Sequence, residues 1–211
     1  MTGYAESAGV VYVLDDDAYA RQGLDNLLQS VGLQVMTFAS VKEFLGSVRP
    51  DAASCLVLDV RLPGLSGLDF QTELMKLNIN IPIVFITGHG DIPMTVRAMK
   101  AGAVEFLTKP IREQDLLDAV RIALDRDSTQ RSNAKAITDT RARLESLTPR
   151  ERDVVALVTS GRMNKQVAAE LGVSEVTVKV NRHNAMKKLG TKSLADLVRL
   201  VDKVGIRRTV P

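Results

Sequence analysis

The chain has 211 residues, of which 45% are hydrophobic, and its formal net charge is +3. That length can bury one large core or two modest ones, and we expect two domains. The single cysteine, Cys55, excludes an internal disulfide and fits a small buried residue in a reducing cytosol. The N-terminus lacks a secretory signal pattern, and no apolar run approaches the roughly 18 residues of a membrane span. The sequence therefore predicts a soluble, cytoplasmic protein without a membrane partner.

The net charge conceals an asymmetry along the chain. Residues 1–125 hold 10 Lys and Arg against 16 Asp and Glu, whereas residues 147–211 hold 13 against 6. The intervening residues 126–146 carry a net charge of +2. A basic terminal domain is typical of nucleic-acid binding, but such a charge is also common as a solubility device. Sequence motifs have to decide between these two interpretations.

Short apolar runs alternate with amphipathic stretches through the acidic part of the chain. The runs are VVYVL at 10–14, QVMTF at 34–38, CLVLD at 55–59, PIVFI at 82–86 and VEFLT at 104–108. The helical stretches that follow them are 18–31, 40–47, 66–77, 91–101 and 112–125. Continuous apolar runs indicate strands that are covered on both faces. We therefore expect a doubly wound α/β domain with a five-stranded parallel sheet and right-handed crossovers.

Polar residues follow several of these strands, at the sheet edge where parallel sheets bind their ligands. They are Asp15, Asp16, Asp59, Thr87 and Lys109. Crowded carboxylates repel one another unless a cation compensates, and ligands that are all oxygen atoms favour Mg²⁺. Asp59 is then placed as a nucleophile toward a phosphoryl group, whose oxygens Lys109 and Thr87 would stabilise.

Four stretches resemble the receiver domain of two-component response regulators: LDDD at 14–17, LDVRLPG at 58–64, ITGHGD at 86–91 and LTKP at 107–110. The resemblance covers about residues 8–125. It implies a flavodoxin-like fold in which Asp59 is the phospho-acceptor. It also implies that Asp15, Asp16, Asp59 and the backbone carbonyl of Arg61 hold Mg²⁺.

The same resemblance assigns roles to residues near the last two strands. Thr87 and Phe106 would form a switch pair, and Lys109 would contact the phosphate, just before a proline that is typically cis in this family. Each also has an ordinary alternative, as a strand end, a core residue and a solvated cation respectively. His89 and Arg61 lie at positions that the resemblance links to the rate of dephosphorylation, and a plain loop role is the alternative.

A haloacid-dehalogenase-like phosphatase is a rival interpretation, because Asp15-x-Asp17 after an apolar strand has the spacing of that family's nucleophile and general acid. However, Tyr19 stands where those enzymes prefer Thr or Val. The rival also leaves Asp59 and the basic domain unexplained. Within the receiver interpretation, Asp17 lies beyond the acidic pair and is expected to cap the first helix.

Capping signals predict three helices in the basic part of the chain. The helices are 149–160, 164–172 and 175–189, and their expected caps are Thr148 with Glu151 in a capping box, Asn164 and Ser174. A helix, a three-residue turn and a second helix form a helix-turn-helix unit. The apolar residues expected to pack it are Val167, Ala168, Leu171, Val173, Val176, Val180 and Leu189, with an outward-facing Val180 as the alternative.

The remaining surface of the third helix is polar and basic. It carries Thr177, Lys179, Arg182, His183, Lys187 and Lys188. Residues 147–200 resemble the LuxR-type helix-turn-helix. The resemblance implies that Lys179, Val180 and His183 face bases, while Lys165, Thr177, Arg182 and Lys187 contact phosphates. Many relatives have Lys or Arg where His183 stands, so a neutral contact is expected there.

A last helix, from its cap at Ser193 to about Val204, resembles the family's dimerisation helix. Its apolar residues could equally pack inside one monomer; they are Leu194, Leu197, Val198 and Val201.

Together these features resemble the NarL/FixJ type of response regulator. The expected organisation is a receiver at 8–125, a polar helical linker at 126–146 and a separate all-α helix-turn-helix domain at 147–207. The linker has no clear apolar stripe, so we expect it to be solvent-exposed. Such a chain regulates transcription and is no enzyme, beyond catalysing its own Mg²⁺-dependent phosphorylation and dephosphorylation. The implied partners are double-stranded DNA, a sensor histidine kinase, RNA polymerase and, on phosphorylation, a second copy of the chain. A receiver that acts only through protein contacts is the remaining alternative.

Overall fold

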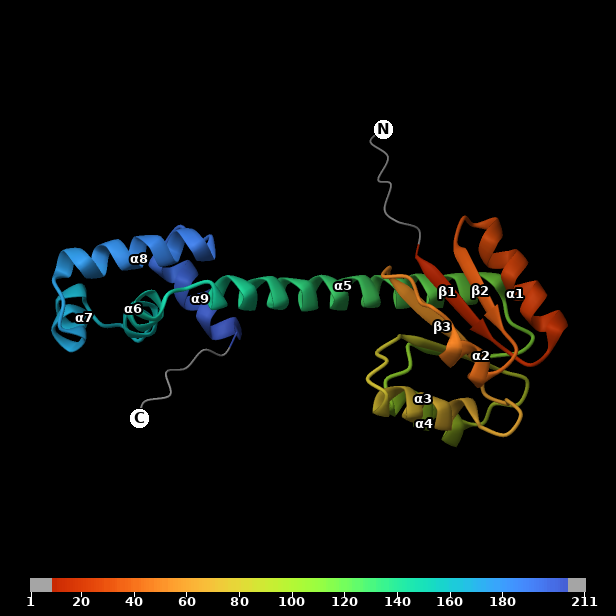
Figure 1. The fold of residues 1–211 in the computed structure, drawn as a ribbon. Helices are drawn as coiled ribbons and strands as arrows, with labels where there is room; N and C mark the ends of the chain where they lie inside the picture. The colour runs from red at the N-terminus through yellow and green to blue at the C-terminus, as the bar shows by residue number, and fades with distance from the viewer. Residues whose placement is uncertain (1–8, 205–211) are drawn as a thin grey trace. The chain divides into compact units, whose positions relative to one another are not determined.

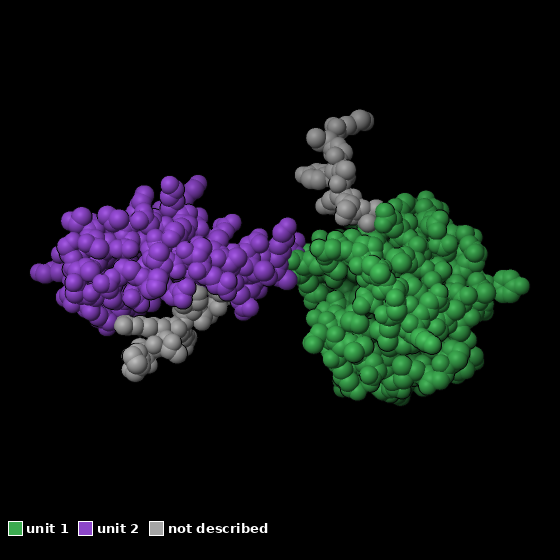
Figure 2. All heavy atoms as spheres, in the orientation of Figure 1, with its two compact units in different colours: residues 1–131 green, residues 132–211 purple. Residues whose placement is uncertain are grey.

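The computed structural model describes residues 9–204. Its contacts divide the chain into two compact units, which meet between Arg131 and Ser132 (Figure 2). Within residues 9–204, no helix combines the length and the apolar composition that crossing a membrane requires.

Unit 1 alternates strands with helices, as the apolar runs predict (Figure 1). Its elements are β1 (Val10–Leu14), α1 (Ala18–Ser30), β2 (Gln34–Phe38), α2 (Val41–Gly46), β3 (Ser54–Asp59), α3 (Gly67–Lys76), β4 (Ile83–Thr87), α4 (Ile92–Lys100), β5 (Glu105–Thr108) and the first part of α5 (Glu113–Glu145). The strands form one parallel sheet in the order β2-β1-β3-β4-β5. The predicted doubly wound, flavodoxin-like fold is confirmed.

The sheet is covered on both faces because neighbouring side chains of a strand point in opposite directions. Tyr12 packs on one face in a cluster with Phe44 of α2 and Phe70 of α3. Val13 packs on the other face in a cluster with Leu28 of α1 and Leu116 of α5. The rings of Phe44 and Phe70 meet edge to face, with centroids 5.9 Å apart. Apolar contacts thus hold helices on both sides, which leaves the carboxyl ends of the strands free for polar residues.

The polar continuation of α5 is attached to unit 1 through Asp127, whose side chain is buried. Its Oδ2 accepts hydrogen bonds from the Ser54 amide at 2.9 Å and from Arg131 Nε at 2.7 Å. Arg131 also donates to Asp51 at 2.5 Å. The expectation that the linker is solvent-exposed is therefore wrong at Asp127. The reason lies in the tertiary structure, because the first amide of β3 needs an acceptor there.

Unit 2 consists of helices, and its first element is the end of α5. The others are α6 (Pro149–Thr159), α7 (Asn164–Leu171), α8 (Glu175–Leu189) and α9 (Leu194–Val204). The capping box of Thr148 and Glu151 is confirmed, as is the Ser174 cap. The Asn164 cap is wrong, since Met163 is the N-cap and its amide donates to Gln166 at 2.9 Å.

The core of unit 2 differs from expectation on α8. Val176 is 68% exposed, whereas Val178 is fully buried. Val178, Ala185 and Leu189 recur at helical spacing and lie on the buried face. Val176 and Val180 fall on the opposite face, and Val180 is 53% exposed, as its alternative role requires. The presence of a valine does not show whether that side of α8 is buried, because the buried side is set by where α7 contacts α8.

We expect Asp127→Asn to destabilise unit 1 by about 1–3 kcal/mol, because a buried charged acceptor of two hydrogen bonds is lost. Cys55 is the only cysteine, and burial raises the pKa of its thiol to about 12. Thiol labelling in increasing urea therefore reports the opening of unit 1. The exposed Asp125→Asn is the matched control on the same helix. Equal labelling midpoints for the two variants would contradict the expectation.

Candidate functional site

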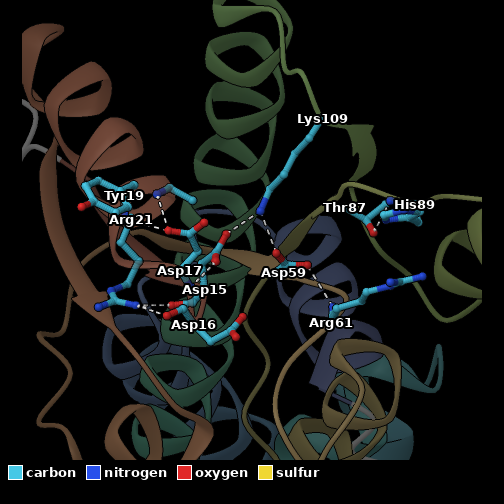
Figure 3. A network of polar contacts seen from close by, with 11 residues as sticks. Asp15, Asp16, Asp17, Tyr19, Arg21, Asp59, Arg61, Thr87, His89 and Lys109 are labelled. Atoms are coloured by element: carbon cyan, nitrogen blue, oxygen red, sulfur yellow. Dashed lines mark hydrogen bonds and ion pairs between the residues drawn. The ribbon is translucent and has the colours of Figure 1, made fainter.

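The carboxyl ends of β1, β3 and β5 bring together the polar residues expected there (Figure 3). Asp15 follows β1, Asp59 ends β3 and Lys109 follows β5. Because Leu14 pairs with Leu58 in the parallel register, Asp15 and Asp59 lie beside each other. Both carboxylates are buried, whereas Asp16 is exposed.

Lys109 joins the two buried carboxylates. Its Nζ lies 2.7 Å from Asp15 Oδ2 and 2.7 Å from Asp59 Oδ2. Burial lowers the pKa of the Lys109 ammonium, but its hydrogen bonds to both aspartates and their charges outweigh that effect, so the pKa is raised. The ammonium thus keeps its proton at neutral pH and supplies a fixed positive charge beside Asp59.

Backbone amides hold the other oxygen of each buried carboxylate. The Asp17 amide donates to Asp15 Oδ1 and the Arg61 amide to Asp59 Oδ1, each at 2.9 Å. At Gly67, the start of α3, an added Cβ would lie 2.4 Å from the Asp59 carbonyl oxygen. No sequence motif singles out Gly67, because only the close approach of two backbone segments shows that a side chain would not fit there.

The three aspartates form a group that fits a divalent cation. Asp15, Asp16 and Asp59 each offer a carboxylate oxygen, and these atoms lie within 4.8 Å of one another. Lys109 offsets one of their three negative charges, and a divalent ion would balance the other two. A donor set of oxygen atoms alone fits Mg²⁺. The role of the Arg61 carbonyl stays a prediction.

The predicted switch pair lies on β4 and β5: Thr87 is the last residue of β4, and Phe106 lies within β5. Thr87 is buried, and its carbonyl accepts from the Lys109 amide at 2.7 Å, which ties the two strands together. Phe106 is 9% exposed. A Cβ on Gly90 would lie 2.9 Å from the Phe106 ring and 3.2 Å from Thr87 Cγ2. The loop at Gly90 therefore packs closely against both residues. Its remaining polar residue, His89, donates its amide to the Thr87 hydroxyl at 3.3 Å.

Asp17 caps α1, as expected. Its Oδ1 accepts from the amides of Tyr19 at 2.8 Å and Ala20 at 3.3 Å. A carboxylate held in this way serves the helix and not a reaction at Asp15, which counts against the phosphatase interpretation. The peptide bond between Lys109 and the next residue, Pro110, is cis, as the resemblance implies.

The exposed face of α8 gathers most of the predicted DNA contacts. Lys179, Val180, His183 and Lys187 are exposed there, and Val176, which the sequence analysis placed in the core, joins them. These positions follow one another at helical spacing, so they form one stripe.

The other predicted phosphate contacts lie around this stripe and are held in different ways. Lys165 is exposed on α7, and Thr177 is exposed with its hydroxyl 2.9 Å from that of Ser174. Arg182 is half-buried and donates to Asn164 Oδ1 at 3.2 Å. The Arg182 guanidinium thus also braces the start of α7 against α8.

Two adjacent lysines on α8 have different surroundings. Lys188 Nζ lies 2.6 Å from Glu151 Oε2 and 3.3 Å from the Ser146 carbonyl oxygen. The hydrogen bond from Lys188, followed by that from the Thr148 amide, lowers the pKa of the buried Glu151. Lys188 thus fastens α8 to α6, while Lys187 remains exposed to contact a partner.

Comparison with known proteins identifies both units. Residues 11–121 match the family model of the response regulator receiver domain. Residues 145–201 match that of the bacterial regulatory proteins of the luxR family. The chain belongs to the response regulator family. It is a DNA-binding transcriptional regulator of the two-component type, controlled by phosphorylation.

The chain is similar to several proteins over most of its own length and most of theirs. Nodulation protein W of Bradyrhizobium diazoefficiens is 57% identical over 96% of this chain and 89% of that protein. Response regulator protein TodT of Pseudomonas putida is 50% identical over 95% of this chain and 88% of that protein. The low-resolution structure of the response regulator StyR is 52% identical, with a TM-score of 0.85 over 93% of this chain and 100% of that one. Full-length FixJ from B. japonicum is 39% identical, with a TM-score of 0.55 over 93% and 97%.

We expect Glu151→Gln to destabilise unit 2 of this response regulator by about 1–3 kcal/mol at neutral pH, because the buried ion pair with Lys188 is lost. The folded pKa of Glu151 is lowered below its unfolded value of about 4.3, so its contribution is present above that pH and disappears as the pH falls through the folded pKa. Far-UV circular dichroism in urea at several pH values measures the difference. The exposed Glu175→Gln is the control, and a pH-independent difference would contradict the ion pair.

Proposed function

We propose that Asp59 receives the phosphoryl group of this response regulator from a sensor histidine kinase. An oxygen of its carboxylate attacks phosphorus, the bond from phosphorus to the donor nitrogen breaks, and an acyl phosphate forms. The observation that carries the assignment is the Lys109 ammonium, which lies 2.7 Å from Asp59 and from Asp15. It places a permanent positive charge where the phosphoryl oxygens of a modified Asp59 would lie.

Asp15, Asp16, Asp59 and the Arg61 carbonyl would hold Mg²⁺, whose charge would neutralise phosphoryl oxygens during transfer. The side chains do the rest. Lys109 supports the transferred group, and the Thr87 hydroxyl donates to one of its oxygens. The same residues would serve water-dependent loss of the phosphate, so the receiver would catalyse both its own phosphorylation and its own dephosphorylation.

We further propose that the switch passes from Thr87 to Phe106 and favours a homodimer that occupies two DNA half-sites. Support comes from Gly90, which packs against both residues. The same proposal includes RNA polymerase as a partner of the DNA-bound dimer and the cytoplasm as the location of the protein. The limits 8–125, 126–146 and 147–207 remain predictions, and residues 8 and 205–207 lie outside the described part of the chain.

On DNA, α8 would enter the major groove with its N-terminal half toward the bases. Lys179, Val180 and His183 would face base edges, because they share the exposed stripe of α8. The phosphate contacts would be Lys165, Thr177, Arg182 and Lys187, which lie on or beside that stripe.

We expect Asp59→Asn and Asp16→Asn to abolish labelling by acetyl phosphate, the first by removing the nucleophile and the second by removing an anionic ligand of Mg²⁺. Asp118→Asn, an exposed change on α5, should label like the unaltered chain. Stoichiometry near one phosphate per chain is expected, measured with radioactive donor. Undiminished labelling with a chelator would overturn the metal assignment, and steady phosphomonoester turnover would favour the phosphatase alternative.

Lys179 and Lys187 of α8 should differ in what they contribute to DNA binding. Lys187→Ala should weaken binding equally on all sequences and reduce the salt slope by about one per half-site, because a phosphate contact releases counterions. Lys179→Ala should cost about 1–3 kcal/mol on the preferred site and little on random DNA. Titrations on selected and scrambled duplexes at several salt concentrations measure both. Salt-insensitive binding would favour a receiver that acts only through protein contacts.

A further inference from the structure

Arg21 of α1 holds the acidic loop from behind (Figure 3). Its Nη1 donates to the carbonyl oxygen of Asp15 at 2.7 Å and to that of Asp16 at 2.9 Å. The Arg21 backbone amide donates to the Asp17 carbonyl oxygen at 3.0 Å. One residue thus binds three successive carbonyls of the loop that carries the acidic pair, and no motif in the sequence analysis included it.

The three carboxylates of the proposed metal site are held in different ways. Asp15 and Asp59 each accept one hydrogen bond from Lys109 and one from a backbone amide. The carboxylate of Asp16 accepts none from the described part of the chain. Its direction therefore depends on the backbone at its own Cα.

That backbone is what Arg21 fixes. The peptide planes on either side of the Asp16 Cα carry the carbonyls of Asp15 and Asp16, and these are the groups that Arg21 Nη1 binds. Fixing both planes fixes φ and ψ of Asp16, since these angles are the only soft backbone dihedrals of a residue. The Cα–Cβ bond of Asp16 is then aimed, and the rotamers open to its side chain are restricted, without any direct contact to the carboxylate.

We propose that Arg21 is a positioning residue that orients Asp16 to bind Mg²⁺, an inference that rests on the metal site proposed above. Such outer partners change metal affinity by about 10–100-fold when they are removed. The direction in which Mg²⁺ affinity changes when Arg21 is replaced distinguishes a positioning role from a simple effect of its charge. A guanidinium beside a cation site repels the cation, so a pure charge effect predicts tighter Mg²⁺ binding when Arg21 is replaced.

The test measures Mg²⁺ binding to the full chain by isothermal titration calorimetry. Arg21→Met removes every donor yet keeps an unbranched side chain that favours a helix. We expect its dissociation constant for Mg²⁺ to rise about tenfold or more. Arg112→Met makes the same charge change at a side chain that is 83% exposed, and it should leave the constant unchanged.

A double variant tests whether Arg21 acts through Asp16. If it does, adding Arg21→Met to Asp16→Asn should cause no further loss of Mg²⁺ affinity. A second readout is phosphorylation by acetyl phosphate. In Arg21→Met the Mg²⁺ concentration for half-maximal rate should rise, while the rate at saturating Mg²⁺ is retained.

Unchanged or tighter Mg²⁺ binding by Arg21→Met would overturn the proposal, as would fully additive losses in the double variant. If Arg21→Met fails to fold, as judged by Cys55 labelling, Arg21→Lys replaces it. That variant keeps the charge but lacks the planar fork, and it should also bind Mg²⁺ more weakly. A different result would refute the metal site itself. If the unaltered chain binds Mg²⁺ and Asp16→Asn binds it equally well, Asp16 is no ligand, and the role proposed for Arg21 falls with the site.

Discussion

The ion pairs of Lys109 with Asp15 and Asp59 are the interaction on which the function proposed for unit 1 depends. A single ammonium, 2.7 Å from each carboxylate, links the ends of three strands that are far apart in sequence. It places a positive charge between two buried carboxylates and so offsets the repulsion between them. The same charge faces the oxygen that would carry phosphate. One set of ion pairs thus stabilises the sheet edge and also places the positive charge that the proposed phosphoryl transfer to Asp59 requires.

The rest of the site depends on backbone segments that pack closely around these ion pairs. Gly67 lets the start of α3 pass under the Asp59 carbonyl, and Gly90 lets a loop pack against Thr87 and Phe106. On the opposite side, Arg21 holds the carbonyls of the acidic loop. The carboxylates are therefore held by a frame of backbone groups, and a change at Asp59 has physical routes to several loops at once.

The two units solve the problem of burying charge in the same way. In unit 2 the buried Glu151 accepts from the Thr148 amide and from Lys188, as Asp15 in unit 1 accepts from an amide and from Lys109. Glu151 and Asp15 therefore each have one backbone donor and one ammonium, and the buried Asp127 has a backbone donor and a guanidinium. In unit 2 this pairing engages the ammonium of Lys188, whose side chain stays 37% exposed, while the neighbouring Lys187 is exposed as well.

The sequence by itself determined the parallel sheet, the helix-turn-helix and the acidic site, because apolar periodicity, caps and polar residues after strands are local patterns that suffice for them. Only the tertiary structure decided the faces and partners of individual residues. It turned Val176 outward, engaged Lys188 with Glu151 and buried Asp127 against the first amide of β3. These outcomes depend on contacts between elements that are distant in the chain. The polarity of a residue does not specify which of those elements it will contact.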